Sequence, residues 1–208
     1  MAINVRTPPP VEPVTLEEAK LHCRIDVDAD DTLINALIQT AREYCEGFQH
    51  RAYVEQTVEY TLGSWPPRPV IYLPRPPVQE ILSVSYLDAD GASQSFTDYI
   101  ADTDSEPARV VLEYGASWPT EQLYPVNPIR IEFIAGHEPE PAADPADPPD
   151  YRANIPESVK AAIKLCVGNW YENREGVLPA GNVGKELPMG VQALLWMARF
   201  FWTEDFNR

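Results

Sequence analysis

Prolines limit the fold of this chain more than any other feature, because there are 22 of them in 208 residues, about twice the ordinary usage. A proline lacks the backbone N–H and interrupts helices and sheet interiors. Their positions therefore divide the chain into segments. The proline-rich stretches SWPPRP (64–69) and LPRPP (73–77) suit loops and sheet edges, so regular structure is expected between such stretches.

The first segment predicts two helices after an N-terminal arm that ends at Pro13. The motif TLEE at 15–18 is a capping box, in which Thr15 and Glu18 each accept a hydrogen bond from the other's backbone N–H. A short helix is expected from there to about Cys23. A second follows DVDADD, since its apolar residues keep a spacing of about 3.6: Ile34, Leu37, Ile38, Ala41, Tyr44, Cys45 and Phe48.

The middle of the chain changes from helical spacing to strict alternation. In YVEQTVEYTL (53–62) apolar residues alternate with Glu and Thr, which predicts a half-buried strand. ILSVSYLDADG (81–91), RVVLEY (109–114) and IRIEFIAG (129–136) predict further strands, with Ile129, Ile131 and Phe133 on one face. Residues 53–136 are therefore expected to form an antiparallel β-insert.

The last third of the chain, from residue 137, predicts a linker and two more helices. Residues 137–154 hold five prolines and five acids with one base, which is typical of a solvated, semi-extended linker. A helix is expected from Pro156, with Gly176 as its C-terminal cap, and another from about Met189 to Phe201. The predicted class is α+β: a helical domain of about four helices (1–52 and 155–208) interrupted by the β-insert and the linker.

Charge and cysteine usage restrict the functional classes. With 32 acids against 16 bases the net charge is −16, and no three basic residues are consecutive. Tight binding to nucleic acid or to an anionic membrane is disfavoured, since both need clustered Lys and Arg. Cys23, Cys45 and Cys166 are too far apart in sequence for a zinc ribbon and suggest buried free thiols. No signal peptide is recognised, and a soluble cytoplasmic protein is expected.

Several fragments resemble catalytic or metal-binding motifs, but each lacks a required group. DVDADD begins like a calcium loop, yet Asp31 stands where the turn needs glycine and Leu37 where it needs an acid. AGNVGKE resembles a phosphate loop, but Glu186 replaces the hydroxyl residue that follows the lysine. A four-ligand metal site from His22, Cys23, Cys45 and His50 conflicts with the core position of Cys45. The chain is therefore predicted to be no enzyme and to bind no cofactor or metal.

Two stretches leave alternatives open. VGNWYENREG (167–176) reads as the polar end of a helix, or as a subunit contact made by Tyr171, Asn173 and Arg174. PMGVQALLWMARFFW (188–202) carries apolar side chains on every face of its predicted helix, Trp196 among them. Such a helix is either buried on all sides or shared with a partner, because aromatic residues, Met and Arg are the usual anchors of interfaces.

These same stretches resemble the head–tail connector (adaptor) proteins of long-tailed bacteriophages and phage-like particles. The likeness lies in PVTLEEAKLHCRID and DDTLINALIQTAREYCEGFQHRA near the start, and in IPESVKAAIKLCVGNWYENREG and LPMGVQALLWMARF near the end. YLDADG (86–91) and YGASWP (114–119) are similar to the subgroup with a β-insert between the second and third helices.

The resemblance implies a structural role in the virion neck. Family members form a dodecameric ring under the portal protein, extend the DNA exit channel, and carry stopper, tail-completion or tail-terminator proteins, while DNA passes without specific binding. It implies that the C-terminal segment docks onto the portal, with Phe200, Phe201, Trp202, Phe206 and Arg208 as candidates. For the subunit interface the candidates are Tyr171, Asn173, Arg174 and Trp196. Assembly is expected in the host cytoplasm. The rival hypotheses are another neck or tail-completion protein, an uncharacterised metal-dependent hydrolase, and a scaffold unrelated to phage.

Overall fold

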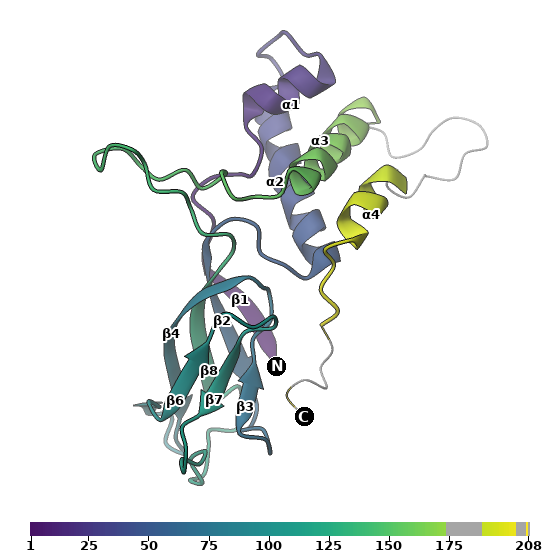
Figure 1. The fold of residues 1–208 in the computed structure, drawn as a ribbon. Helices are drawn as coiled ribbons and strands as arrows, with labels where there is room; N and C mark the ends of the chain where they lie inside the picture. Colours follow the sequence, from purple (N-terminus) through teal and green to yellow (C-terminus); the bar gives the residue numbers. More distant parts are fainter. Residues whose placement is uncertain (174–188, 203–206, 208) are drawn as a thin grey trace, which may run out of the picture. The chain divides into compact units, whose positions relative to one another are not determined.

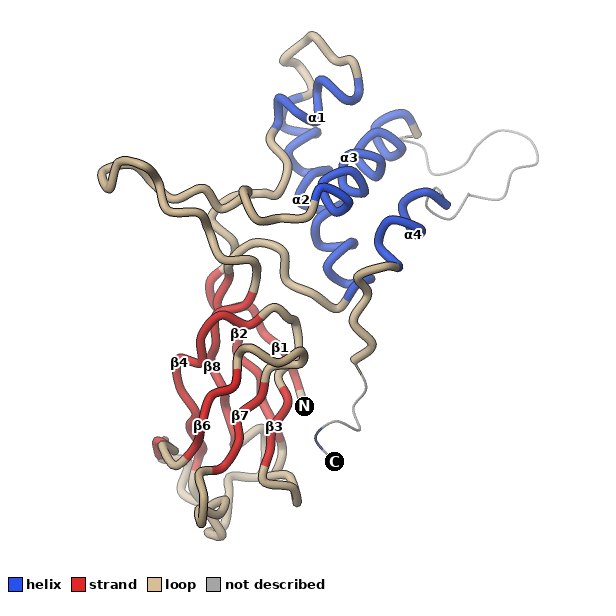
Figure 2. Tube along the Cα trace, in the orientation of Figure 1, coloured by secondary structure: helices blue, strands red, loops and turns tan. Residues whose placement is uncertain are grey.

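The computed structural model describes residues 1–173, 189–202 and 207, which form four α-helices and eight β-strands. The chain divides into two compact units, which Figures 1 and 2 show as strands in one and helices in the other. We name them by content. The β-unit comprises Met1–Pro10, His50–Glu138 and Phe201–Arg208, and the helical unit comprises Val11–Gln49 and Pro139–Phe200. The predicted α+β class is confirmed.

The β-unit contains two antiparallel sheets. The larger has the strand order β1-β2-β8-β4-β5, with bounds Ala2–Thr7, Gln56–Leu62, Ile129–Ala135, Val78–Leu87 and Ser93–Ser95. The smaller has the order β3-β7-β6, with bounds Val70–Tyr72, Arg109–Leu112 and Tyr99–Asp102. Alternating patterns predicted β2, β4, β7 and β8. They missed β3, β5 and β6, because the short sequences VIY, SQS and YIAD do not alternate between apolar and polar residues.

Side chains from both sheets share one hydrophobic core. On β8, Ile131 and Phe133 are fully buried, as the alternation predicted. Ile71 of β3 and Val110 of β7 belong to the same buried cluster. Because one core serves both sheets, their inner faces pack against each other as in a sandwich.

Strand β1 was not predicted. The residues up to Pro13 were expected to be an arm, yet Ala2–Thr7 pair with β2. All of them except Ala2 are exposed, so the strand has no buried face. Only Ile3 and Val5 alternate with the polar residues Asn4 and Arg6, which is too short a pattern to predict a strand. The pairing also shields a side chain of β2 from solvent. Glu59 is only 9% exposed and accepts a 2.6 Å hydrogen bond from Arg6 of β1.

The helical unit is built around two packed helices. Its elements are α1 (Leu16–Cys23), α2 (Asp31–Gln49), α3 (Glu157–Glu172) and α4 (Met189–Trp196). Helices α2 and α3 contact each other, and α1 and α4 each contact both. The capping box of α1 is present, with Thr15 N donating to Glu18 Oε2 at 2.8 Å and Glu18 N to Thr15 Oγ1 at 3.1 Å. The predicted stripes of α2 and α3 supply the buried residues Ile34, Ile38, Ala41, Cys45, Val159, Ala162, Ile163, Cys166 and Val167. The predicted cap Gly176 lies outside the described residues.

Helix α4 ends earlier than predicted, at Trp196 rather than near Phe201. The cause is the C-terminus of α2. The buried Gln49 side chain donates to Leu195 O at 2.6 Å, and Phe200 N donates to Gln49 O at 2.9 Å. Because these contacts satisfy groups that a longer helix would pair internally, the chain leaves the helix at this point.

The acidic, proline-rich stretch at 137–154 contains a closed loop. Glu140 and Asp150 exchange two backbone hydrogen bonds, of 3.0 and 2.8 Å, which join the two ends of the loop. Beyond it, Arg152 Nε donates to Glu12 O at 2.8 Å. The residues between the paired positions are largely exposed, as expected for so polar a stretch. Among the described residues, no helix is both long and apolar enough to cross a membrane.

Gly136, which follows β8, occupies a place that no other residue fits. Its φ is +114°, and an added Cβ would lie 2.3 Å from Val54 O and 2.7 Å from Glu55 N. These are backbone atoms, which move only if the strand ends separate. Left-handed strain and overpacking each cost about 1–3 kcal/mol.

We therefore expect Gly136→Ala to lower the free energy of unfolding of the β-unit by about 2–4 kcal/mol. The matched control is Gly63→Ala, because a Cβ at Gly63 would meet nothing within 4 Å. That variant should stay within about 1 kcal/mol of the wild type. Urea denaturation followed by tryptophan fluorescence measures both, and equal stability of the two variants would contradict the steric account.

Candidate functional site

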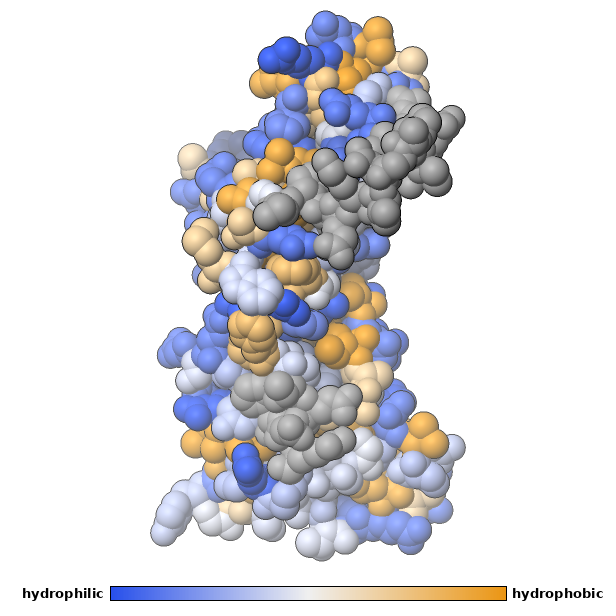
Figure 3. Space-filling view, turned by 90° about the vertical axis from the view of Figure 1, so that its right-hand side faces the viewer, coloured by the Kyte–Doolittle hydropathy of each residue, from blue (hydrophilic) through white to orange (hydrophobic). Residues whose placement is uncertain are grey.

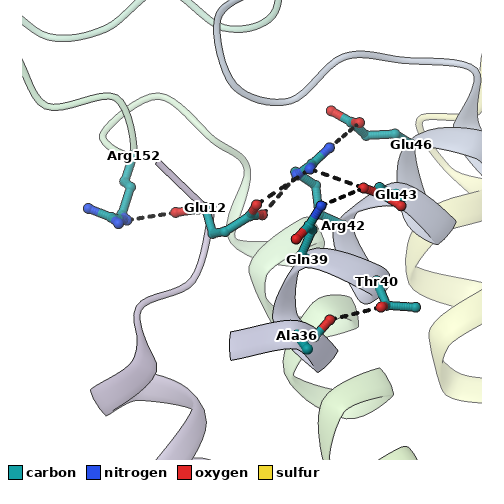
Figure 4. A network of polar contacts seen from close by, with 8 residues as sticks. All are labelled: Glu12, Ala36, Gln39, Thr40, Arg42, Glu43, Glu46 and Arg152. Carbon is teal, nitrogen blue, oxygen red and sulfur yellow. Dashed lines mark hydrogen bonds and ion pairs between the residues drawn. The ribbon is translucent and has the colours of Figure 1, made fainter. Parts of the chain in front are cut away.

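A buried arginine joins three segments of the helical unit (Figure 4). Arg42 of α2 donates from Nε to Glu12 Oε2 at 2.8 Å and from Nη1 to Glu46 Oε2 at 2.9 Å. Its side chain is 8% exposed and that of Glu46 is 5% exposed. Arg152 binds the backbone oxygen of Glu12 from the other side. We call these four residues the Arg42 network.

The electrostatics of the Arg42 network keep the arginine charged. Burial alone lowers the pKa of the Arg42 guanidinium, but the hydrogen bonds and charges of Glu12 and Glu46 outweigh it, so the pKa is raised. The partners that bind the guanidinium are carboxylates of this chain. The arrangement therefore fixes segments to each other and offers no reactive group. The sequence carried one sign of it, the Arg42–Glu46 pair at i,i+4.

The end of α3 holds the first set of predicted interface residues. Tyr171 Oη donates to Asp30 Oδ2 at 2.6 Å, and Asn173 Nδ2 donates to Asn169 O at 2.8 Å. The polar tips of both side chains thus bind within the helical unit. Arg174 lies outside the described residues. Nothing in these contacts tests a role between subunits, which stays a prediction.

The end of α4 displays the exposed apolar residues that the sequence singled out. Trp196 is 56% exposed and Met197 is 80% exposed. One side of Trp196 is occupied within the unit, since its ring centroid lies 6.3 Å from that of Phe48 and the Arg199 guanidinium lies over both rings. Val191 and Leu195 are buried. Helix α4 therefore combines a buried face with an exposed one, and Figure 3 shows apolar groups among hydrophilic residues on this side of the molecule.

Of the five predicted portal-docking residues, one is exposed, two are half-buried and two lie outside the described residues. Phe201 is 60% exposed. Trp202 is half-buried against the core of the β-unit, with its ring edge-on to Tyr60 at 6.2 Å. Phe200 is half-buried in the helical unit. Phe206 and Arg208 lie outside the described residues. Asn207, which no sequence pattern marked as a site residue, binds the β-unit with three hydrogen bonds.

The groups that resemble metal ligands are otherwise engaged. Lys20 Nζ donates to Asp28 at 2.6 Å and to Asp31 at 2.8 Å, and the first contact lowers the pKa of Asp28. Cys45 and Cys166 are both buried, and their thiols form a hydrogen bond with each other. This hydrogen bond, together with burial, raises the pKa of the Cys45 thiol. Over residues 1–173, 189–202 and 207, no three His, Cys, Asp or Glu side chains are grouped to hold a metal ion.

Comparisons with known proteins show which family and which solved structures this chain resembles. Residues 13–113 match the family described as "Phage gp6-like head-tail connector protein". No curated protein matches the chain. The fold is similar to that of a chain in the neck of an empty gene transfer agent particle computed with C6 symmetry, with 21% identity, a TM-score of 0.73 and full coverage of both chains.

Two further structures have the same fold. One is a chain from the neck of a native gene transfer agent particle computed with C12 symmetry, with 20% identity, a TM-score of 0.69 and full coverage of both chains. The other is from the virion of the native particle, with 20% identity and a TM-score of 0.71 over 98% of this chain and 97% of that one. The resemblance to head–tail connectors expected from the sequence is confirmed by the family match.

Proposed function

We propose that the chain is a structural connector of a virion neck, because its residues 13–113 match the phage gp6-like head–tail connector family. The family match carries this proposal. The shared fold with neck proteins over the full length supports it, because it extends to the helices beyond residue 113. The role is mechanical and non-enzymatic: the protein links the capsid portal to the tail-side proteins of the neck.

In this proposal copies of the chain form a ring of twelve. The C12 and C6 symmetry of the similar neck structures supports a ring of this kind. A closed ring needs heterologous contacts, in which two different surfaces of each copy meet. Trp196 and Met197 supply one apolar surface, and Tyr171, Asn173 and Arg174 at the end of α3 remain candidates for the neighbouring copy.

The proposed partner on the capsid side is the portal protein. Its binding segment is 200–208, in which Phe201 is a candidate anchor because it is an aromatic residue that is 60% exposed. Trp202, Phe200, Phe206 and Arg208 complete the candidate set. On the tail side the ring would carry a stopper, tail-completion or tail-terminator protein. The site of action is the neck of the particle, after assembly in the host cytoplasm.

The charge of the chain suits a DNA channel. A net charge of −16 repels phosphates, so a polyanion passes without the counterion exchange that tight binding requires. The protein would guide DNA without holding it.

Native mass spectrometry of the protein, alone and mixed with the portal encoded by the same genome, tests the proposal. We expect a complex with connector and portal in equal copy number, because a closed ring gains from many weak contacts at once. A protein that stays monomeric and ignores the portal would refute the connector role. Titration with divalent cations would then test the metal-dependent hydrolase.

A further inference from the structure

The side chain of Asn207 pairs with a strand edge as a peptide group would. Tyr72 N donates to Asn207 Oδ1 at 2.8 Å, and Asn207 Nδ2 donates to Tyr72 O at 2.9 Å. The carboxamide thus satisfies both the donor and the acceptor of one backbone residue. Such two-point pairing fixes direction and position as well as contact.

Tyr72 belongs to β3, the outer strand of the three-stranded sheet. The next residue, Leu73, donates its N–H inward to Ala108 O at 2.8 Å. Backbone groups alternate in direction along a strand, so those of Tyr72 face outward, where a further strand would pair. Open edges of this kind recruit other chains unless something covers them. At the outer edge of β3, the side chain of Asn207 pairs with Tyr72 in place of a further strand.

Two contacts with Tyr60, one aromatic and one a hydrogen bond, hold the same segment. Trp202 packs edge-on against Tyr60, whose ring is fully buried, with centroids 6.2 Å apart. Asn207 Nδ2 also donates to Tyr60 Oη at 3.1 Å. Residues 202 and 207, on both sides of 203–206, therefore bind neighbouring points of the β-unit.

We propose that Asn207 and Trp202 form a latch that holds the C-terminal segment on its own β-unit and must open before this segment binds the portal. The second half of the proposal rests on the proposed function. Trp202 is a candidate portal anchor, and the part of its ring that packs on Tyr60 is not accessible to another protein while this contact exists. Binding of the whole ring by the portal therefore competes with its contact to the β-unit.

The latch predicts a measurable loss of affinity in the free protein. When only the open fraction of a protein is competent to bind, the apparent dissociation constant rises by the inverse of that fraction. Asn207 is outside the set of portal anchors, so removing its side chain opens the latch while the anchors remain. Portal binding should then become tighter, by about five- to ten-fold for the loss of one or two net hydrogen bonds.

Hydrogen exchange of the full-length protein tests the latch without any partner. The Tyr72 amide donates to Asn207, so its exchange rate reports the contact directly. Asn207→Ala should raise that rate by about five- to ten-fold. The Leu73 amide, which donates within the sheet, should keep its rate in the same experiment. Asn4→Ala, which removes an exposed asparagine from β1 of the same unit, is the matched control and should change neither.

Portal binding of the same variants, measured by surface plasmon resonance, tests the competition. Faster Tyr72 exchange with tighter portal binding supports both halves of the proposal. Unchanged Tyr72 exchange in Asn207→Ala overturns the latch, whatever the portal does. Faster exchange with unchanged or weaker binding overturns the competition. If the wild type and all variants ignore the portal, the proposed function fails, while the exchange of Tyr72 still decides whether the latch exists.

Discussion

Deletion of residues 200–208 is expected to weaken binding to the portal by about 100-fold or more, because it removes every candidate anchor and aromatic hot spots contribute about 2 kcal/mol or more each. The β-unit should remain folded, with a modest fall in melting temperature. Trp202 lies half-buried on the core of this unit, and an edge-on aromatic pair contributes about 0.5–1.5 kcal/mol beyond its buried area. Surface plasmon resonance and thermal denaturation measure the two effects separately.

Two point variants separate lost contact from lost stability. Phe201→Ala removes an exposed ring and should weaken portal binding by about ten-fold or more at an unchanged melting temperature. Tyr114→Ala removes a fully exposed ring from the β-unit outside the segment and should bind as the wild type does. Wild-type affinity of the truncated protein would show that the portal is contacted by other residues.

Arg42→Ala should lower the free energy of unfolding of the helical unit by about 3–5 kcal/mol, since truncating one member of a buried ion pair leaves its partner charged and uncompensated. That partner is Glu46, whose side chain is 5% exposed. Helical circular dichroism during urea denaturation gives the value. The substitution should also remove the hydrogen bond that fixes Glu12 to α2. Because Arg152 binds the backbone oxygen of Glu12, the contact between the segments of Glu12 and Arg152 should weaken as well.

The matched control lies on the surface of the same unit. Glu157→Ala breaks the Lys160–Glu157 ion pair, whose glutamate side chain is 81% exposed, and such pairs contribute about 0–1 kcal/mol. Replacing both charges, with Arg42→Met and Glu46→Leu, should recover most of the stability, because no buried charge is then left alone. A loss below about 1 kcal/mol in Arg42→Ala would mean that water reaches Glu46 and that the network is not a structural joint.

Prediction from the sequence succeeded where local spacing and burial carry the same information. The 3.6 period of α2 and α3 and the alternation of β8 place most of their apolar residues in the two cores, since a side chain buried on a regular element must recur with its period. Tyr44 of the predicted stripe on α2 is an exception, because it is 37% exposed. The capping box of α1 is equally local, because Thr15 and Glu18 satisfy each other within one turn. The family resemblance drew on these same helices.

Prediction from the sequence failed where the secondary structure or the contacts of a residue depend on a partner that is distant in the sequence. Strand β1 is exposed, and only its pairing with β2 makes it a strand. Helix α4 ends at Trp196 because Gln49, 146 positions earlier than Leu195, binds the Leu195 carbonyl. Asn207 lies in a short polar segment without period, so nothing nearby marks it as a contact of Tyr72.

The sequence alone therefore determined the α+β class, the positions of the long elements, the two cores and the likeness to head–tail connectors. Each of these follows from patterns that neighbouring residues share. The tertiary structure alone decided which edges are paired, where α4 stops, how Arg42 is neutralised and where the C-terminal segment rests. These depend on single hydrogen bonds between residues 30 to 146 positions apart, and such bonds impose no period on the sequence around them.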